Sequence, residues 1–219
     1  MSEKVNKMII CPKCSKESET ELICSMNGKS FPDMKKRIFE DKFFEWKCPK
    51  CGHESDLLHP LLYNDIENKF MVYYIPDTKR KVVVDEKLEK EFFELSYIKK
   101  RIVSGVNELK EKIAIFDFGA DDMAVELAKY AVERIVEKSA NMTVSSGYFL
   151  DMDRTENTIS FQFFVGSKNR PYIQTTRLEV YERSMGIVKK YFKGFGKQHG
   201  FIKIDREWAK EAWKIYKNS

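Results

Sequence analysis

Two short motifs with the same sequence constrain this chain more than any other feature. Segments 11–14 and 48–51 both have the sequence C-P-K-C. Each follows a strand-like run and precedes a polar turn, so each is expected at the tip of a β-hairpin. A Cys-x-x-Cys turn directs two sulfurs to one point, and two such turns supply the four ligands of a tetrahedral metal site.

The same cysteines could instead form disulfides or a redox centre. The chain has five cysteines, an odd number, and its N-terminus lacks the long apolar region and cleavage site of a signal peptide. We therefore expect a reducing, cytoplasmic setting, where structural disulfides are rare. A redox motif is typically a single pair beside a βαβ pattern, which is not the context here. The motifs favour Zn²⁺, with iron as a competitor for the same thiolates.

The residues around the motifs refine this prediction. Gly52 directly follows the second motif and supplies a position that tolerates a backbone φ above zero. Ser15 stands at the corresponding place in the first motif, so that turn is predicted to be more strained. Lys13, Lys47 and Lys50 stand within the two turns, where their charge offsets the excess negative charge of four thiolates.

The segment between the motifs is predicted to contain a short helix. The motifs are separated by 33 residues, more than the roughly 15–20 usual in a compact zinc site. Segment 30–41, "SFPDMKKRIFED", accounts for the excess, because Ser30 and Pro32 are helix-start signals. Its predicted apolar face consists of Met34, Ile38 and Phe39.

We expect a structural rather than a catalytic zinc ion, because four thiolates fill the tetrahedral shell that a catalytic zinc leaves partly open. Such an ion contributes on the order of 10 kcal/mol to folding. The metal ligands are predicted to be Cys11, Cys14, Cys48 and Cys51. Cys24 is expected to be a small buried residue, and His53 and His59 to lie around the ligands or at the surface.

These motifs, together with the residues that follow them, resemble the CpXC proteins, a prokaryotic family. The resemblance rests on the two Cys-Pro-x-Cys motifs, on Met26-Asn27, on "HPLLYND" at 59–65 and on "KFMVYYIP" at 69–76. Segment 101–129 is also similar to members of the family. The resemblance implies a zinc-ribbon-like N-terminal part in a soluble prokaryotic protein, and it implies no reaction.

The remaining chain predicts an α+β fold with two domains, a zinc-ribbon-like domain at 1–76 and a larger mixed domain at 77–219. Asp121 and Asp205 are expected to cap helices. The helix after Asp121 is predicted to bury a stripe made of Ala124, Leu127, Ala128, Ala131 and Ile135. Helices are predicted over 85–96, 105–116, 122–139, 181–192 and 205–217, and strands over 97–103, 143–152, 157–165, 171–180 and 200–204.

Tyr63 and Asp65 are candidates for binding a ligand or a water molecule. They stand two positions apart on a predicted strand and would share one face. The alternative is a turn in which Asn64 and Asp65 bond the local backbone while Tyr63 packs in the core. The residue types at 63–65 favour this turn over a ligand-binding role.

A basic segment near the C-terminus is a candidate nucleic-acid contact. The formal net charge is zero over 1–76, −1 over 77–176 and +6 over 177–219. Within 189–203, basic residues alternate with aromatic ones, a combination that can bind phosphates and stack on bases. The alternative is a loop whose aromatic rings belong to the core. The candidate contacts are Lys189, Lys190, Lys193 and Lys197.

Three functions are compatible with these features. The first is a non-catalytic protein that binds a protein or ligand partner, and the sequence favours it because no nucleophile–base motif accompanies its three histidines. The second is a nucleic-acid-binding protein that uses the C-terminal lysines. The third is an enzyme with a site between the two parts that includes Tyr63, Asp65 and His59. No apolar run approaches the roughly 18–20 residues of a membrane span, so no membrane partner is expected.

Overall fold

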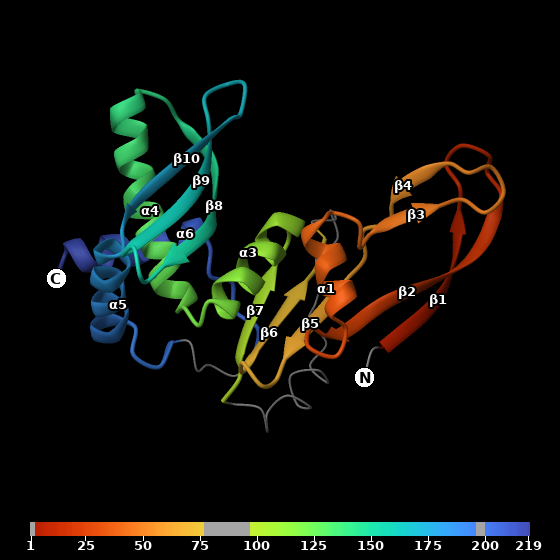
Figure 1. Ribbon diagram of the computed structural model, residues 1–219, viewed down its shortest axis with the longest axis horizontal. Coiled ribbons are helices and arrows are strands. Elements are labelled where there is room, and N and C mark those ends of the chain that lie inside the picture. The colour runs from red at the N-terminus through yellow and green to blue at the C-terminus, as the bar shows by residue number, and fades with distance from the viewer. Residues whose placement is uncertain (1–2, 77–96, 196–199) are drawn as a thin grey trace. The chain divides into compact units, whose positions relative to one another are not determined.

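The computed structural model describes residues 3–76, 97–195 and 200–219 and confirms the α+β prediction (Figure 1). The chain divides into two compact units, residues 1–110 and 111–219. The domain boundary predicted after residue 76 adjoins residues 77–96, and the helix predicted over 85–96 lies within them. Both fall outside the described residues and stay predictions.

The first unit contains a five-stranded sheet in the order β1-β2-β5-β6-β7. The pairs β1–β2 and β5–β6 are antiparallel, whereas β2–β5 and β6–β7 are parallel. The strand predicted over 97–103 is therefore hydrogen-bonded into the first sheet. Its strands are β1 (Glu3–Ile10), β2 (Glu17–Asn27), β5 (Leu61–Asp65), β6 (Phe70–Tyr74) and β7 (Lys99–Val103).

Two hairpins in this unit carry the two cysteine motifs, with the predicted short helix between them. The first motif joins β1 to β2, and the second joins β3 (Glu45–Lys47) to β4 (Glu54–Asp56). Helix α1 spans Pro32–Phe39 and begins at the proline. The predicted apolar face is right for Ile38, which is buried, but wrong for Phe39, which is 40% exposed. Phe39 is the last residue of the helix.

Two asparagines connect the ends of the parallel strands β2 and β5. Asn27 Nδ2 donates to Asn64 Oδ1 at 3.0 Å, and Asn64 Nδ2 donates to the Met26 carbonyl at 3.0 Å. Asn27 Oδ1 also accepts the backbone N–H groups of Lys29 and Ser30, just before α1. These bonds give the Met26-Asn27 and Tyr63-Asn64 dipeptides a structural role, because they hold the crossover between the two strands.

Tyr63 is completely buried and stacks on Phe70, with ring centroids 5.8 Å apart. Its hydroxyl end lies over Gly28, where an added Cβ would come within 1.8 Å of Tyr63 Oη. Gly28 is therefore required for this packing.

Gly28→Ala is expected to destabilise the protein by about 1–3 kcal/mol, because the buried Tyr63 ring must move. Urea unfolding measures this loss. Gly186→Ala is the matched control, because Gly186 lies in helix α5 (Glu179–Tyr191) with open space around its Cβ position. That substitution should be neutral or stabilise by up to about 1 kcal/mol. Equal effects at the two sites would contradict the proposed packing constraint.

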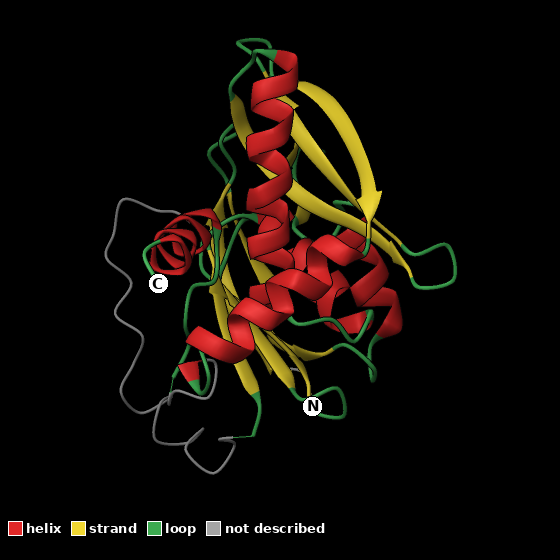
Figure 2. Cartoon of the chain, turned by 90° about the vertical axis from the view of Figure 1, so that its left-hand side faces the viewer, coloured by secondary structure: helices red, strands yellow, loops and turns green. Residues whose placement is uncertain are grey.

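The second unit packs helices against an antiparallel sheet in the order β10-β9-β8. Figure 2 shows the long helix α4 (Asp122–Ala140) along this sheet. Alternate residues of β9 are buried, as expected for a strand with one face in the core. The strands are β8 (Val144–Asp153), β9 (Thr158–Val165) and β10 (Arg170–Arg177), and the other helices are α3 (Val106–Asp117), α5 and α6 (Arg206–Lys217). The division between the units falls within α3.

The structure confirms both predicted caps and corrects two other details. Asp121 accepts the N–H groups of Met123 and Ala124, and Asp205 accepts that of Trp208. The apolar stripe predicted for α4 is wrong at Ile135, which is 64% exposed, because the stripe runs instead through Val132 and Val136. The strand predicted over 200–204 is also wrong, since that segment forms only an isolated bridge at 202.

A network of buried charges links α3 to α4 in the second unit. Lys129 Nζ lies 2.8 Å from Glu111 Oε1 and 2.9 Å from Glu126 Oε1. Glu111 Oε1 also accepts the backbone N–H of Phe149 at 2.6 Å. Burial alone lowers the pKa of Lys129, but the two carboxylates outweigh it and raise the pKa above its ordinary value. The ammonium is therefore charged and compensates both acids.

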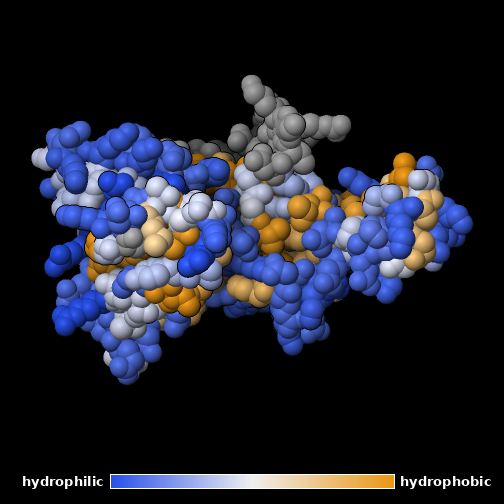
Figure 3. All heavy atoms as spheres, turned by 90° about the horizontal axis from the view of Figure 1, so that it is seen from above, coloured by the Kyte–Doolittle hydropathy of each residue, from blue (hydrophilic) through white to orange (hydrophobic). Residues whose placement is uncertain are grey.

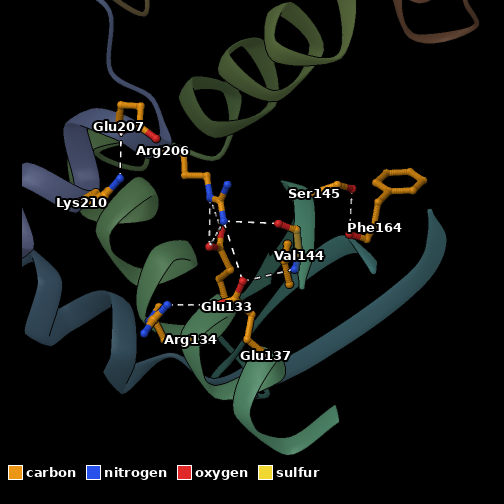
Figure 4. Close-up of polar contacts among 9 residues, drawn as sticks. All are labelled: Glu133, Arg134, Glu137, Val144, Ser145, Phe164, Arg206, Glu207 and Lys210. Carbon is orange, nitrogen blue, oxygen red and sulfur yellow. Dashed lines mark hydrogen bonds and ion pairs between the residues drawn. The ribbon is translucent and has the colours of Figure 1, made fainter. Parts of the chain in front are cut away.

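A second polar contact fixes the start of α6 (Figure 4). Arg206 Nε lies 3.0 Å from both carboxylate oxygens of the buried Glu133, and Arg206 also donates to the Val144 carbonyl at 3.3 Å. The neighbouring Glu137 accepts the Val144 N–H at 3.2 Å. One guanidinium thus joins α6, α4 and β8.

Lys129→Met is expected to cost about 3–5 kcal/mol, because it leaves the buried Glu111 carboxylate without its cation and Glu126 with only the more distant Lys112, at 3.6 Å. Arg134→Met is the control, since Arg134 belongs to an ion pair with Glu137 and its own side chain is exposed. Its loss should cost no more than about 1 kcal/mol. Chemical unfolding of both variants measures the difference, and similar losses would argue against a buried, charged Lys129.

Candidate metal centre

The tips of the two hairpins meet at the four cysteines of the motifs. The Sγ atoms of Cys11, Cys14, Cys48 and Cys51 all lie within 4.8 Å of one another. Between the tips, Cys11 Sγ lies 3.7 Å from Cys51 Sγ, and Cys14 Sγ lies 3.8 Å from Cys48 Sγ. All four are free thiols. In a tetrahedral site with Zn–S bonds of about 2.3 Å, sulfurs stand about 3.8 Å apart. The four cysteines could therefore hold one metal ion.

The two motifs form turns with the same backbone hydrogen bonds. The N–H groups of Ser15 and Gly52 donate to the carbonyls of Cys11 and Cys48, each at 2.9 Å. The N–H of Cys11 donates to the Lys16 carbonyl at 3.1 Å, and that of Cys48 to the His53 carbonyl at 2.8 Å. Ser15 has a φ of 55° and Gly52 a φ of 70°. The correspondence predicted between these two residues is confirmed.

Ser15→Gly is expected to stabilise the protein by about 0.5–1 kcal/mol, because a left-handed φ is unfavourable for serine and relaxed for glycine. Thermal unfolding of the metal-loaded protein measures the gain. Ser15→Ala serves as the control, since alanine keeps the Cβ and the strain. A gain in the alanine variant equal to that of the glycine variant would show that φ is not the cause.

The Cys11 and Cys51 thiols differ in their affinity for protons. Burial raises the pKa of Cys11, but the N–H groups of Cys14 and Lys13 and the neighbouring thiols lower it to about 7. For Cys51, the His53 N–H lowers the pKa, while desolvation and the three other thiols raise it to about 12. A metal ion bound here at neutral pH would therefore displace a proton from Cys51. Metal binding should release protons and weaken as the solution becomes more acidic.

Hydrophobic residues surround the buried side of the sulfur cluster. Cys11 and Cys48 pack with Trp46, and Ile9 and Leu57 complete this small core. Trp46 Nε1 donates to Thr20 Oγ1 on β2 at 3.1 Å. The indole therefore connects the second hairpin both to the cysteines and to the large sheet.

The two histidines near the motifs take part in backbone structure. His53 contributes its carbonyl to the second turn, as described above. His59 is buried, and its ring nitrogens lie 2.7 Å from the Leu57 carbonyl and 3.1 Å from the Ile23 carbonyl. The metal cluster within the described residues consists of the four motif cysteines, so neither histidine nor Cys24 belongs to it.

Tyr63 and Asp65 have local structural contacts. Asp65 is buried, and its carboxylate accepts the backbone N–H of Asn68 at 3.0 Å and the Asn68 side-chain amide at 2.8 Å. These bonds form the turn between β5 and β6, while Tyr63 packs over Gly28. A ligand-binding role for Tyr63 or Asp65 stays a prediction.

The basic C-terminal segment presents lysines, but its aromatic rings pack inward. Lys189 and Lys190 lie exposed in the last turn of α5, and Lys193 is also exposed, whereas Lys197 is outside the described residues. The rings of Phe192 and Phe195 pack against Trp208, with centroids 5.5 and 6.3 Å from it. These rings are thus occupied in the core, and nucleic-acid binding by the lysines stays a prediction.

The family model described as CpXC protein matches residues 9–129, more than half of the chain. The chain belongs to the CpXC protein family. The match contains both cysteine motifs, Asn27 and Asn64 of the crossover, and the buried Lys129. No curated protein and no solved structure matches the CpXC chain. Among the described residues, no helix has the length and apolar character that a bilayer span requires.

The four cysteines could be predicted as candidate metal ligands because the local Cys-x-x-Cys spacing marks them in the sequence. Sequence reasoning missed the roles of Asn27 and Thr20, whose partners Asn64 and Trp46 are distant in the chain. The similarity of Met26-Asn27 and of 59–65 to the CpXC family was the one available signal for the asparagine pair.

Proposed function

We propose that Cys11, Cys14, Cys48 and Cys51 bind one Zn²⁺, and that this ion is a structural element of a non-catalytic binding protein. The observation that carries the proposal is the pair of sulfur–sulfur distances across the hairpin tips, 3.7 and 3.8 Å, which match the edge of a tetrahedral zinc–thiolate site. Two turns with identical hydrogen bonds present the sulfurs symmetrically.

A structural role is supported by the size of the second hairpin. Strands β3 and β4 have three residues each, and among the described strands they pair only with one another. An isolated two-stranded hairpin is marginally stable at best in water. An ion that bonds to both tips would hold this hairpin against β1 and β2, and four thiolates would fill its coordination shell.

A binding role is supported by apolar side chains exposed at the edge of the large sheet. Strand β1 is an edge strand, and Met8 and Ile10, on the same face of it, are 60% and 62% exposed. The space-filling view shows hydrophobic residues among hydrophilic ones on the part that carries β1–β4 (Figure 3). An exposed apolar edge is a common feature of protein-interaction surfaces.

Protein purified without added metal is expected to contain about one zinc ion per chain, as measured by elemental analysis. Cys48→Ser should abolish zinc binding and strongly destabilise the protein, because Cys48 is a buried ligand in this proposal. Cys24→Ser should retain the zinc ion, since Cys24 lies outside the cluster.

Four results would contradict this proposal. Absence of metal, or retention of zinc by the Cys48→Ser variant, would exclude the four-cysteine zinc site. Iron in place of zinc would change the identity of the ion. A turnover that persists after substitution of all four cysteines would contradict the non-catalytic role.

A further inference from the structure

A cavity of about 360 Å³ lies in the first unit, beside the hairpin that carries the second cysteine motif. Strand β2, helix α1 and strand β3 contribute its walls. Its apolar floor consists of Leu22, Met26, Phe43, Phe44 and Trp46, all of them buried. Cavities of this size suit an apolar side chain or a small ligand.

A second, more polar cavity of about 510 Å³ adjoins the first. The two cavities share Arg37, Glu45 and Trp46 in their linings, so they are neighbours, and together they are here called the groove. The polar end is lined by residues of the β3–β4 hairpin, including Lys47, Glu54 and Asp56. The groove therefore offers an apolar pocket at one end and ionised groups at the other.

The charges at the polar end are unbalanced in favour of carboxylates. Lys47 is paired with Glu54 at 2.9 Å, and at the other end Lys4 is paired with Glu21 at 2.8 Å. Glu45 and Asp56 stand directly opposite each other in the β3–β4 register. Among the described residues, neither carboxylate has a cation or a hydrogen-bond donor within contact distance.

Arg37 is the remaining charged side chain shared by both cavities. Its Nη2 donates to the Lys42 carbonyl at 2.7 Å, so this group is directed to the backbone beyond the end of α1. Like charges directly opposite in a sheet are destabilising. A cation bound between Glu45 and Asp56 would relieve that repulsion.

We propose that the groove binds an extended peptide segment of a partner protein. An apolar side chain of the segment occupies the pocket beside Trp46, and a neighbouring lysine or arginine lies between Glu45 and Asp56. Such a peptide would be the partner in the binding role proposed above, and this inference rests on that role. The zinc site matters to the groove because Trp46, one of its walls, packs against Cys11 and Cys48.

The test uses fluorescein-labelled hexapeptides that contain one phenylalanine and one lysine separated by one, two or three glycines. Fluorescence anisotropy with the full-length, metal-loaded protein should detect binding of at least one of them. Replacing the lysine by glutamate, or the phenylalanine by glycine, should abolish that binding. Glu45→Gln combined with Asp56→Asn should weaken it about three- to tenfold, the range expected for two partly hydrated charge pairs.

Glu19→Gln combined with Asp33→Asn is the matched control. Both residues are exposed, lie outside the groove and change the net charge equally, so binding should be unchanged. The proposal is overturned if none of the phenylalanine–lysine peptides binds, if the glutamate peptides bind equally well, or if both double variants behave alike.

Zinc content measured on the same samples separates this proposal from the metal site. Zinc-loaded protein that fails to bind any of the peptides would refute the groove while the metal site stands. Peptide binding by protein that contains no zinc would support the groove and refute the structural zinc ion.

Discussion

The contact between the two hairpin tips is the interaction on which the first unit depends. The β3–β4 hairpin forms its own two-stranded sheet, separate from the five-stranded sheet. Its links to the rest of the unit include the sulfur contacts and the bond from Trp46 to Thr20. The cysteine cluster therefore helps to attach this hairpin to the rest of the unit, whereas β1 and β2 are attached to each other by backbone hydrogen bonds. A metal ion bound at the cluster would convert weak thiol contacts into strong coordinate bonds.

The sequence predicts most reliably what depends on neighbouring residues. The cysteine turns, the equivalence of Ser15 and Gly52, and the caps at Asp121 and Asp205 follow from local chemistry, and the structure contains each of them. The stripe on α4 failed at Ile135 because a small error in helical period accumulates over several turns, and the side chain then faces water. The segment 200–204 has strand-like residues, but its buried Ile204 packs into the core without a strand partner.

Pairings between distant segments could not be predicted in this way. Nothing local to 97–103 indicates that β7 lies parallel to β6 in the first sheet, since the partner choice depends on the crossover between them. The buried ion pair between Glu111 and Lys129 in the second unit also joins residues that are distant in the sequence, so it could not be predicted either. Lys129 has the sequence character of a surface residue, because lysine is almost never fully buried unless it is paired. Only the three-dimensional positions of Glu111 and Glu126 reveal the pairing.

The opposed carboxylates of Glu45 and Asp56 connect the metal centre to the proposed binding role. Such a pair costs a free hairpin a substantial share of its stability, since cross-strand pairs are worth roughly 0.2–1 kcal/mol. A structural zinc ion contributes on the order of 10 kcal/mol, so a hairpin fixed by zinc can retain an unfavourable charge pair. Coordination of the cysteines to zinc, as proposed, would free the remaining hairpin residues from stabilising the fold. Their side chains are then available to recognise a basic partner.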